Sequence, residues 1–130
     1  MLELQNEIKI YSINSKHSLI LKTRYLVEIN YTFALFGQSK QNSLTSHFCI
    51  RKEQLKNFCT DLGNEYACVE LADNDSDGYI EIIKNKEKVV VKAQIGGTHE
   101  EYLYIEFESN TRTLKSFIND LNELLRSEDV

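Results

Sequence analysis

The stretch Tyr102-Leu-Tyr-Ile-Glu-Phe-Glu-Ser-Asn-Thr-Arg-Thr-Leu-Lys-Ser-Phe-Ile-Asn-Asp-Leu-Asn-Glu-Leu-Leu-Arg126 decides the fold class, because its hydrophobic period changes halfway along. In the first part, apolar Leu103, Ile105 and Phe107 alternate with polar residues, which predicts a half-buried strand. From Thr111 to about Arg126 the apolar residues recur at helical spacing and predict a helix that Asn110 or Thr111 can cap. The apolar stripe consists of Leu114, Phe117, Ile118, Leu121, Leu124 and Leu125.

Similar period-two segments occur throughout the preceding chain. The longest, Arg24 to Phe36, alternates between two faces and predicts a single long strand. One face carries Tyr25, Val27, Ile29, Tyr31, Phe33 and Leu35, and the other carries Glu28, Asn30 and Thr32. Residues 37–42 then predict a turn that leads into a second strand of the same hairpin, and residues 13–23 are compatible with either a strand or a loop. The further strands expected are Glu7 to Ser12, Leu44 to Ile50, Tyr66–Leu71, Tyr79–Ile83, Val89–Ile95 and Tyr102–Phe107.

Residues 51–62 have helical spacing instead, with Leu55, Phe58, Cys59 and Leu62 on one stripe and Gly63 just beyond the end. Two amphipathic helices must bury their apolar stripes, and the inner face of a sheet is the natural place. The sequence therefore predicts an α+β fold: an antiparallel meander of about six or seven strands, with two helices packed on one face and the other face partly open to water.

The length of 130 residues fits one domain that spans residues 1–130. The chain has no proline, and we detect no low-complexity segment and no internal repeat. No apolar run approaches the roughly 20 residues that span a bilayer, and the polar, acidic start is unlike a secretory signal. A cytoplasmic protein is the resulting expectation.

The charge is distributed unevenly along the chain. Residues 1–60 carry eight Lys/Arg and four Asp/Glu, which is +4, whereas residues 61–130 carry seven and sixteen, which is −9. Such acidity would repel a phosphate backbone and argues against nucleic acid, while a basic protein would be a suitable partner. The alternative interpretation is that acidic residues only keep the protein in solution.

The motif Asp73-Asn-Asp-Ser-Asp-Gly-Tyr-Ile-Glu81 matches the first half of a calcium-binding EF-hand loop. Position twelve, however, is Lys84 in place of the bidentate glutamate, and the flanking segments are strand-like. We therefore expect a polar turn without metal, with calcium as the alternative. The spacing of Cys49, Cys59 and Cys68 fits neither a disulfide scaffold nor a zinc site, so three buried free thiols are expected. No catalytic or cofactor motif is present, and we expect no cofactor and no enzyme.

The candidate functional residues are tyrosines that alternate with carboxylates in the acidic half. Exposed tyrosine contributes contact area at low entropic cost, and carboxylates select a basic partner. The alternative is that tyrosine is simply common in strands. The predicted partner-binding residues are Asp73, Asp75, Asp77, Tyr79, Glu100, Glu101, Tyr102, Tyr104, Glu106 and Glu108.

Residues 52–125 resemble the WapI-type immunity proteins of bacterial polymorphic-toxin systems. The resemblance is carried by Leu55-Lys-Asn-Phe-Cys-Thr-Asp-Leu62, by the strand Tyr102–Glu108, and by a following helix that ends in paired leucines. The family cap, Asp-Gln-Thr, reads Ser109-Asn110-Thr111 here, so its acid and glutamine are missing. The resemblance implies a cytosolic protein that binds and neutralises a toxin, often a nuclease with a basic active site. The alternative is a self-associating structural or regulatory domain, such as a homodimer, without a toxin partner.

Overall fold

The computed structural model describes residues 7–27, 29–97, 99 and 101–127, which form strands and helices in a repeated order. The elements are β1 (Glu7–Tyr11), β2 (Ser18–Val27), β3 (Asn30–Gln38), β4 (Ser43–Arg51), α1 (Lys52–Asp61), β5 (Tyr66–Ala72), β6 (Tyr79–Asn85), β7 (Lys88–Ile95), β8 (Leu103–Asn110) and α2 (Thr111–Ser127). All strand pairs are antiparallel and join neighbours in the chain. The α+β class with two helices agrees with the sequence prediction.

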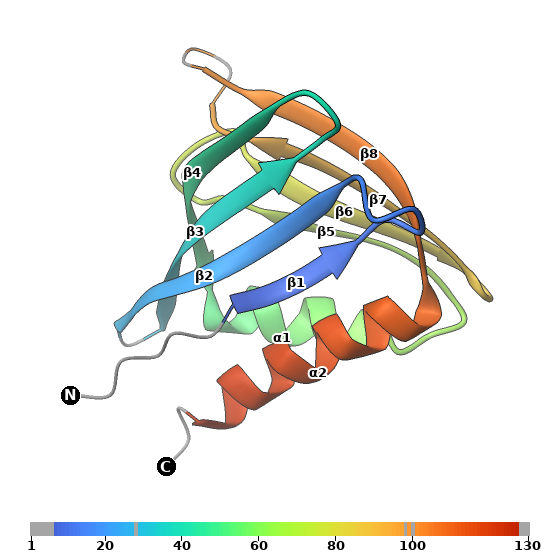
Figure 1. Ribbon diagram of the computed structural model, residues 1–130. Helices are drawn as coiled ribbons and strands as arrows, with labels where there is room; N and C mark the ends of the chain where they lie inside the picture. The colour runs from blue at the N-terminus through green and yellow to red at the C-terminus, as the bar shows by residue number, and fades with distance from the viewer. Residues whose placement is uncertain (1–6, 28, 98, 100, 128–130) are drawn as a thin grey trace.

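The expectation of one sheet of six or seven strands is wrong. The strands form two four-stranded sheets, β1-β2-β3-β4 and β5-β6-β7-β8, that face each other (Figure 1). Both helices lie along one open side between the sheets, where α1 contacts β4 and β5, and α2 contacts β8 and β1. The inner faces are therefore covered by the opposite sheet and by the helices, and each sheet keeps an outer face toward water.

The second half of the chain repeats the first, which the sequence analysis did not detect. Each half is a four-stranded meander followed by a helix. Residues 43–62 and 102–121, which are the last strand and the helix of each half, align without a gap. The identical pairs are Leu44/Leu103, Phe48/Phe107, Leu55/Leu114, Lys56/Lys115, Phe58/Phe117, Asp61/Asp120 and Leu62/Leu121. Most of these are core residues, so the repeat preserves the packing of the helix on the sheet.

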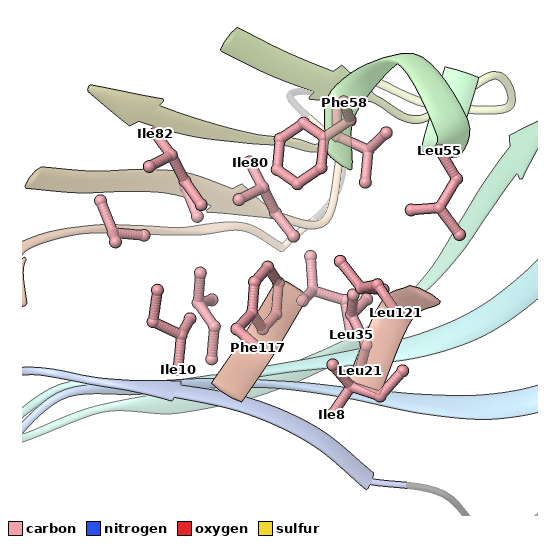
Figure 2. Packing of buried hydrophobic residues seen from close by; sticks show 14 of the residues in the cluster. Ile8, Ile10, Leu21, Leu35, Leu55, Phe58, Ile80, Ile82, Phe117 and Leu121 are labelled. Carbon is pink, nitrogen blue, oxygen red and sulfur yellow. The ribbon is translucent and has the colours of Figure 1, made fainter. Parts of the chain in front are cut away.

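One hydrophobic cluster joins both halves. Side chains from each sheet and each helix converge between the sheets, as Figure 2 shows for Ile10, Ile80 and Phe117. The two equivalent helix phenylalanines, Phe58 and Phe117, are both buried. Because neither sheet can bury its inner face alone, the two halves depend on each other for stability.

Equivalent hydrogen bonds close the two seams between the sheets. The Ile13 N–H, in the loop after β1, donates to the Glu108 carbonyl at 2.9 Å, and the Asn74 N–H, after β5, donates to the Cys49 carbonyl at 2.9 Å. The accepting residues, Glu108 and Cys49, occupy matching positions of β8 and β4. These bonds satisfy backbone groups at strand edges that would otherwise remain unpaired.

The prediction of a single strand from Arg24 to Phe36 is also wrong. Val27 pairs with Asn30, so the chain reverses between them, and β2 and β3 form a hairpin. Of the residues predicted on one face, Tyr31, Phe33 and Leu35 are buried, whereas Tyr25 and Ile29 are exposed. The alternating pattern runs through a turn without glycine or proline, so no local signal marks the reversal. Glu28, predicted on the opposite face, lies outside the described residues. Residues 13–23, which were left open, contain a loop and the start of β2.

Gly37 belongs to β3 and not to the predicted turn, which comprises Ser39–Asn42 instead. This glycine is buried where β3 approaches β7, and a Cβ atom there would overlap Ile95 Cδ1 and lie 2.9 Å from its Cγ1. Gly37 pairs with Leu44 and Ile95 pairs with Leu103, so the two residues occupy equivalent positions of the repeat. Glycine is required because two sheet faces come close together at this point.

The remaining predicted strands and both helices agree with the structure to within a few residues. Asn110, and not Thr111, caps α2, since its Oδ1 accepts the Thr113 N–H at 2.8 Å. No helix in the described part of the chain is long and apolar enough to span a membrane.

We predict that Gly37→Ala destabilises the protein by about 1–3 kcal/mol, because the added methyl group overpacks the contact with Ile95. Ile95→Val alone should cost about 0.5–1.5 kcal/mol through lost packing. In the double variant the shorter valine makes room for the methyl group, so the two effects should be clearly less than additive. Urea unfolding of all four proteins measures this coupling. Strict additivity would show that the two sheets do not meet at this pair.

Candidate protein-binding face

The outer face of the β5–β8 sheet carries four of the ten predicted partner-binding residues, Tyr79, Tyr104, Glu106 and Glu108. We call it the acidic face and define it by alternate residues of four strands. They are Cys68 and Glu70 from β5; Tyr79, Glu81 and Ile83 from β6; Val90, Lys92 and Gln94 from β7; and Tyr104, Glu106 and Glu108 from β8. Their alternation with the buried residues of the inner face places all of them on the solvent side.

A row of charged residues crosses the centre of this face. Glu70 pairs with Glu81, Glu81 with Lys92, and Lys92 with Glu106, so four charged side chains lie abreast. Glu108 lies one row further along β8. With three carboxylates and one ammonium group, this row has a net negative charge. The acidic face as a whole therefore favours a positively charged partner surface.

A row of tyrosines borders the charged row. Tyr79 pairs with Gln94, which pairs with Tyr104, so the two rings lie two strands apart. The Tyr104 hydroxyl donates to Glu106 Oε1 at 3.0 Å. Partial burial, followed by this bond and the nearby Glu106 charge, raises the pKa of Tyr104 above its usual value. The hydrogen bond places the Tyr104 hydroxyl directly beside the Glu106 carboxylate.

Two loops extend the acidic face at the tyrosine end. Asp75 and Asp77 are exposed in the β5–β6 loop, and Glu101 and Tyr102 are exposed just before β8. The loops are neighbours, because a Cβ atom on Gly97 would lie 3.8 Å from Ser76 Cβ. The structure therefore brings most of the predicted residues to one face and one end of the second sheet. Glu100 lies outside the described residues.

Asp73 does not belong to this surface. Its side chain is buried, and its Oδ1 accepts the N–H groups of Cys49 at 3.1 Å and Asp75 at 2.9 Å. Its Oδ2 accepts the Ser76 hydroxyl at 2.9 Å. The carboxylate therefore closes the loop and ties it to β4, which is a structural role. The sequence pattern could not distinguish this aspartate from its exposed neighbours.

The sequence analysis missed Glu70, Glu81, Ile83 and Val90 as members of the acidic face. Their alternation with the buried Leu71, Ile80 and Ile82 is a signal that could have identified them. The alternation could not show that Glu70 and Glu81 lie in one row with Glu106 across the sheet, because this depends on the strand order.

The outer face of the β1–β4 sheet is equivalent to the acidic face in the repeat, but it carries different charged residues. In the alignment of β4 with β8, His47 is equivalent to Glu106. The strand pairs then make Lys22 on β2 equivalent to Glu81 on β6. On the first sheet Glu7 forms ion pairs with Lys9 at 3.2 Å and with Lys22 at 3.5 Å. The acidic character is therefore not a general feature of the repeat, but a property of one sheet.

The three cysteines are free, but they differ in exposure. Cys59 is buried as expected, Cys49 is half-buried, and Cys68 is exposed on the acidic face, contrary to the expectation of three buried thiols. Within the described segments, no group of three His, Cys, Asp or Glu side chains could hold a metal ion. Comparison with protein-family models, with characterised proteins and with solved structures finds no match to this chain.

We predict that Asp73→Ala destabilises the protein by about 1–3 kcal/mol, because it leaves the Cys49 N–H and its loop partners without their acceptor. Asp75→Ala, which removes an exposed carboxylate of the same loop, should change stability by less than about 0.5 kcal/mol. Chemical denaturation of the two variants tests this difference. Equal losses would assign both carboxylates the same role.

We also predict that a maleimide modifies Cys68 first at about pH 8. Burial raises the pKa of the Cys49 thiol, and it raises that of Cys59 to about 11, so both form less of the reactive thiolate. Cys68 is the exposed thiol of the three. Peptide mass spectrometry over a time course gives the order of labelling, and faster labelling of Cys59 than of Cys68 would contradict the burial of Cys59.

Proposed function

We propose that the protein is a non-enzymatic binding module whose acidic face docks on a basic protein. The observation that carries this proposal is the charged row Glu70–Glu81–Lys92–Glu106 beside two tyrosines on an otherwise uncovered sheet face. The equivalent face of the first sheet carries Lys22 and His47 at matching positions, so solubility alone does not account for the acidity.

The chemistry of the face suits a protein partner. Tyr104 is 47% exposed and Tyr102 is 53% exposed, which offers aromatic area for contact. Half-buried Ile83 and Val90 lie in the row beside Glu108 and add apolar surface next to the carboxylates. Interfaces are commonly enriched in tyrosine, and complementary charge speeds association and excludes wrong partners.

The resemblance of residues 52–125 to WapI-type immunity proteins suggests which basic protein this is. We infer a cytoplasmic role in which the module neutralises a cognate bacterial toxin, with the acidic face competing for the basic surface that the toxin uses on its own substrate. A sheet face rich in carboxylates resembles, in charge, the phosphate backbone that a nuclease binds.

The decisive experiment is a pull-down from host lysate with the tagged protein, followed by mass spectrometry. We expect one stoichiometric basic protein that elutes as the salt concentration rises, because salt screens charge pairing. Glu106→Lys should weaken its binding by about tenfold or more, since it replaces attraction by repulsion at the centre of the face.

The matched control is Glu123→Lys, which makes the same charge change at an exposed position of α2. It should leave binding unchanged, and both variants should keep the wild-type melting temperature. Bound partner should also protect Cys68 from maleimide. Equal binding by Glu106→Lys and wild type, or a labelling rate of Cys68 that the partner does not change, would refute the acidic face as the interface.

Self-association is the second candidate, and the opposite charges of the two outer faces favour it. Lys9 and Lys22 lie on the first sheet, and the carboxylates of the acidic face lie on the second. A head-to-tail contact would join the two faces of successive copies. Sedimentation at low salt distinguishes the candidates, because a monomer at all concentrations excludes self-association and leaves the toxin proposal intact.

A further inference from the structure

A cleft of about 810 Å³ lies at the end of the second sheet opposite to the acidic loops. It is lined by the residues that follow α1, by the β6–β7 turn with the adjoining strand ends, and by the first turns of α2. Its size is within the roughly 300–1,000 Å³ of small-molecule sites. Because Tyr79 begins β6 and the turn ends it, the cleft is separate from the tyrosine end of the acidic face.

The cleft is positively charged in a protein whose net charge is −5. Four lysines line it, Lys84, Lys86, Lys88 and Lys115, against two glutamates, Glu65 and Glu87. In the described part of the chain, no ion pair involves any of these lysines. Their charges are thus not neutralised by a carboxylate within bonding distance.

Of the four cleft lysines, Lys84 is half-buried and the other three are exposed. It follows Ile80 and Ile82 on the inner side of β6, and its Nζ donates to the Leu62 carbonyl at 3.2 Å at the end of α1. An ammonium group has three donors, so two remain for a ligand. A half-buried cation with one neutral acceptor favours an anion nearby.

The internal repeat shows that this charge is particular to the second half. Strand pairing places Leu26 where the second half has Lys84, and Asn30 where it has Lys88. Lys115 has a counterpart in Lys56, which the cleft does not include. The lysines from β6 and β7 are therefore not required by the fold.

The floor of the cleft is apolar. Leu62 and Leu114 are buried and Ile118 is half-buried, and all three line the cleft together with the lysines. We propose that this cleft binds a small organic anion with an aliphatic portion, such as a medium-chain carboxylate. The acid group pairs with Lys84, Lys88 and Lys115, and the chain covers Ile118.

The test is a titration of the 130-residue protein with octanoate, followed by amide chemical shifts in two-dimensional NMR spectra. We expect saturable shifts in the residues around Gly63, in the β6–β7 turn and in the first turns of α2. Acetate lacks the aliphatic chain and octylammonium has the opposite charge, so neither compound should produce saturable shifts at the cleft. Shifts confined to the acidic face, or equal saturation by octylammonium, would overturn the proposal.

The variant for this site is Lys88→Gln/Lys115→Gln, which removes two exposed cations that form no ion pair in the described part of the chain, so the protein should keep the spectrum of a folded protein. It should weaken octanoate binding by about tenfold. Lys56→Gln is the matched control, because it makes the same change at the position equivalent to Lys115 on α1, and it should bind octanoate as wild type does. Equal weakening by the control would show a non-specific charge effect and refute the site. Failure of this test leaves the docking of a basic protein on the acidic face unaffected.

Discussion

The close approach of β3 and β7 at Gly37 and Ile95 is the constraint on which the rest of the structure depends. These residues occupy equivalent positions in the two halves, so at this point equivalent strands of the two halves contact each other. The absence of a side chain at Gly37 lets the sheets come together on this side, and the helices occupy the open side between them (Figure 1). Phe58 and Phe117, equivalent residues of the two helices, are then buried in one shared core. Neither half has a closed core without the other.

This arrangement leaves two kinds of surface free to differ between the halves. The outer face of a sheet contributes little to the core, so Glu81 and Glu106 can stand where the first half has Lys22 and His47 without loss of packing. At the end of β6, Lys84 stands in place of Leu26 at a half-buried position on the inner side of the strand. The proposed docking face and the proposed anion cleft are thus compatible with one repeated scaffold, because these charges lie at exposed or half-buried positions and not among the fully buried residues.

Local periodicity predicted most elements because each depends on residues close in the chain. The helix from Thr111 was identified from its stripe and its cap, and the period of two identified β7 and β8. The same rule failed at residues 24–36, because the apolar alternation continues without glycine or proline through the reversal between β2 and β3. Tyr25 and Ile29 fit this alternation but are exposed, whereas Tyr31 is buried. The repeat escaped detection because its identities are sparse: the strands keep only their apolar positions, and identical residues such as Phe58 and Phe117 are separated by a whole meander.

The sequence by itself determined which residues are apolar and at what period, and therefore the two helices, most of the strands and the tyrosine-and-carboxylate pattern of β8. It also determined the excess of negative charge in the second half. Only the tertiary structure decided that the strands form two sheets, that Asp73 turns inward to hold β4, and that Glu70, Glu81 and Glu106 lie abreast. The reason is that strand order and the pairing of loops depend on contacts between residues far apart in the chain, and single-sequence periodicity carries no information on which distant segments meet.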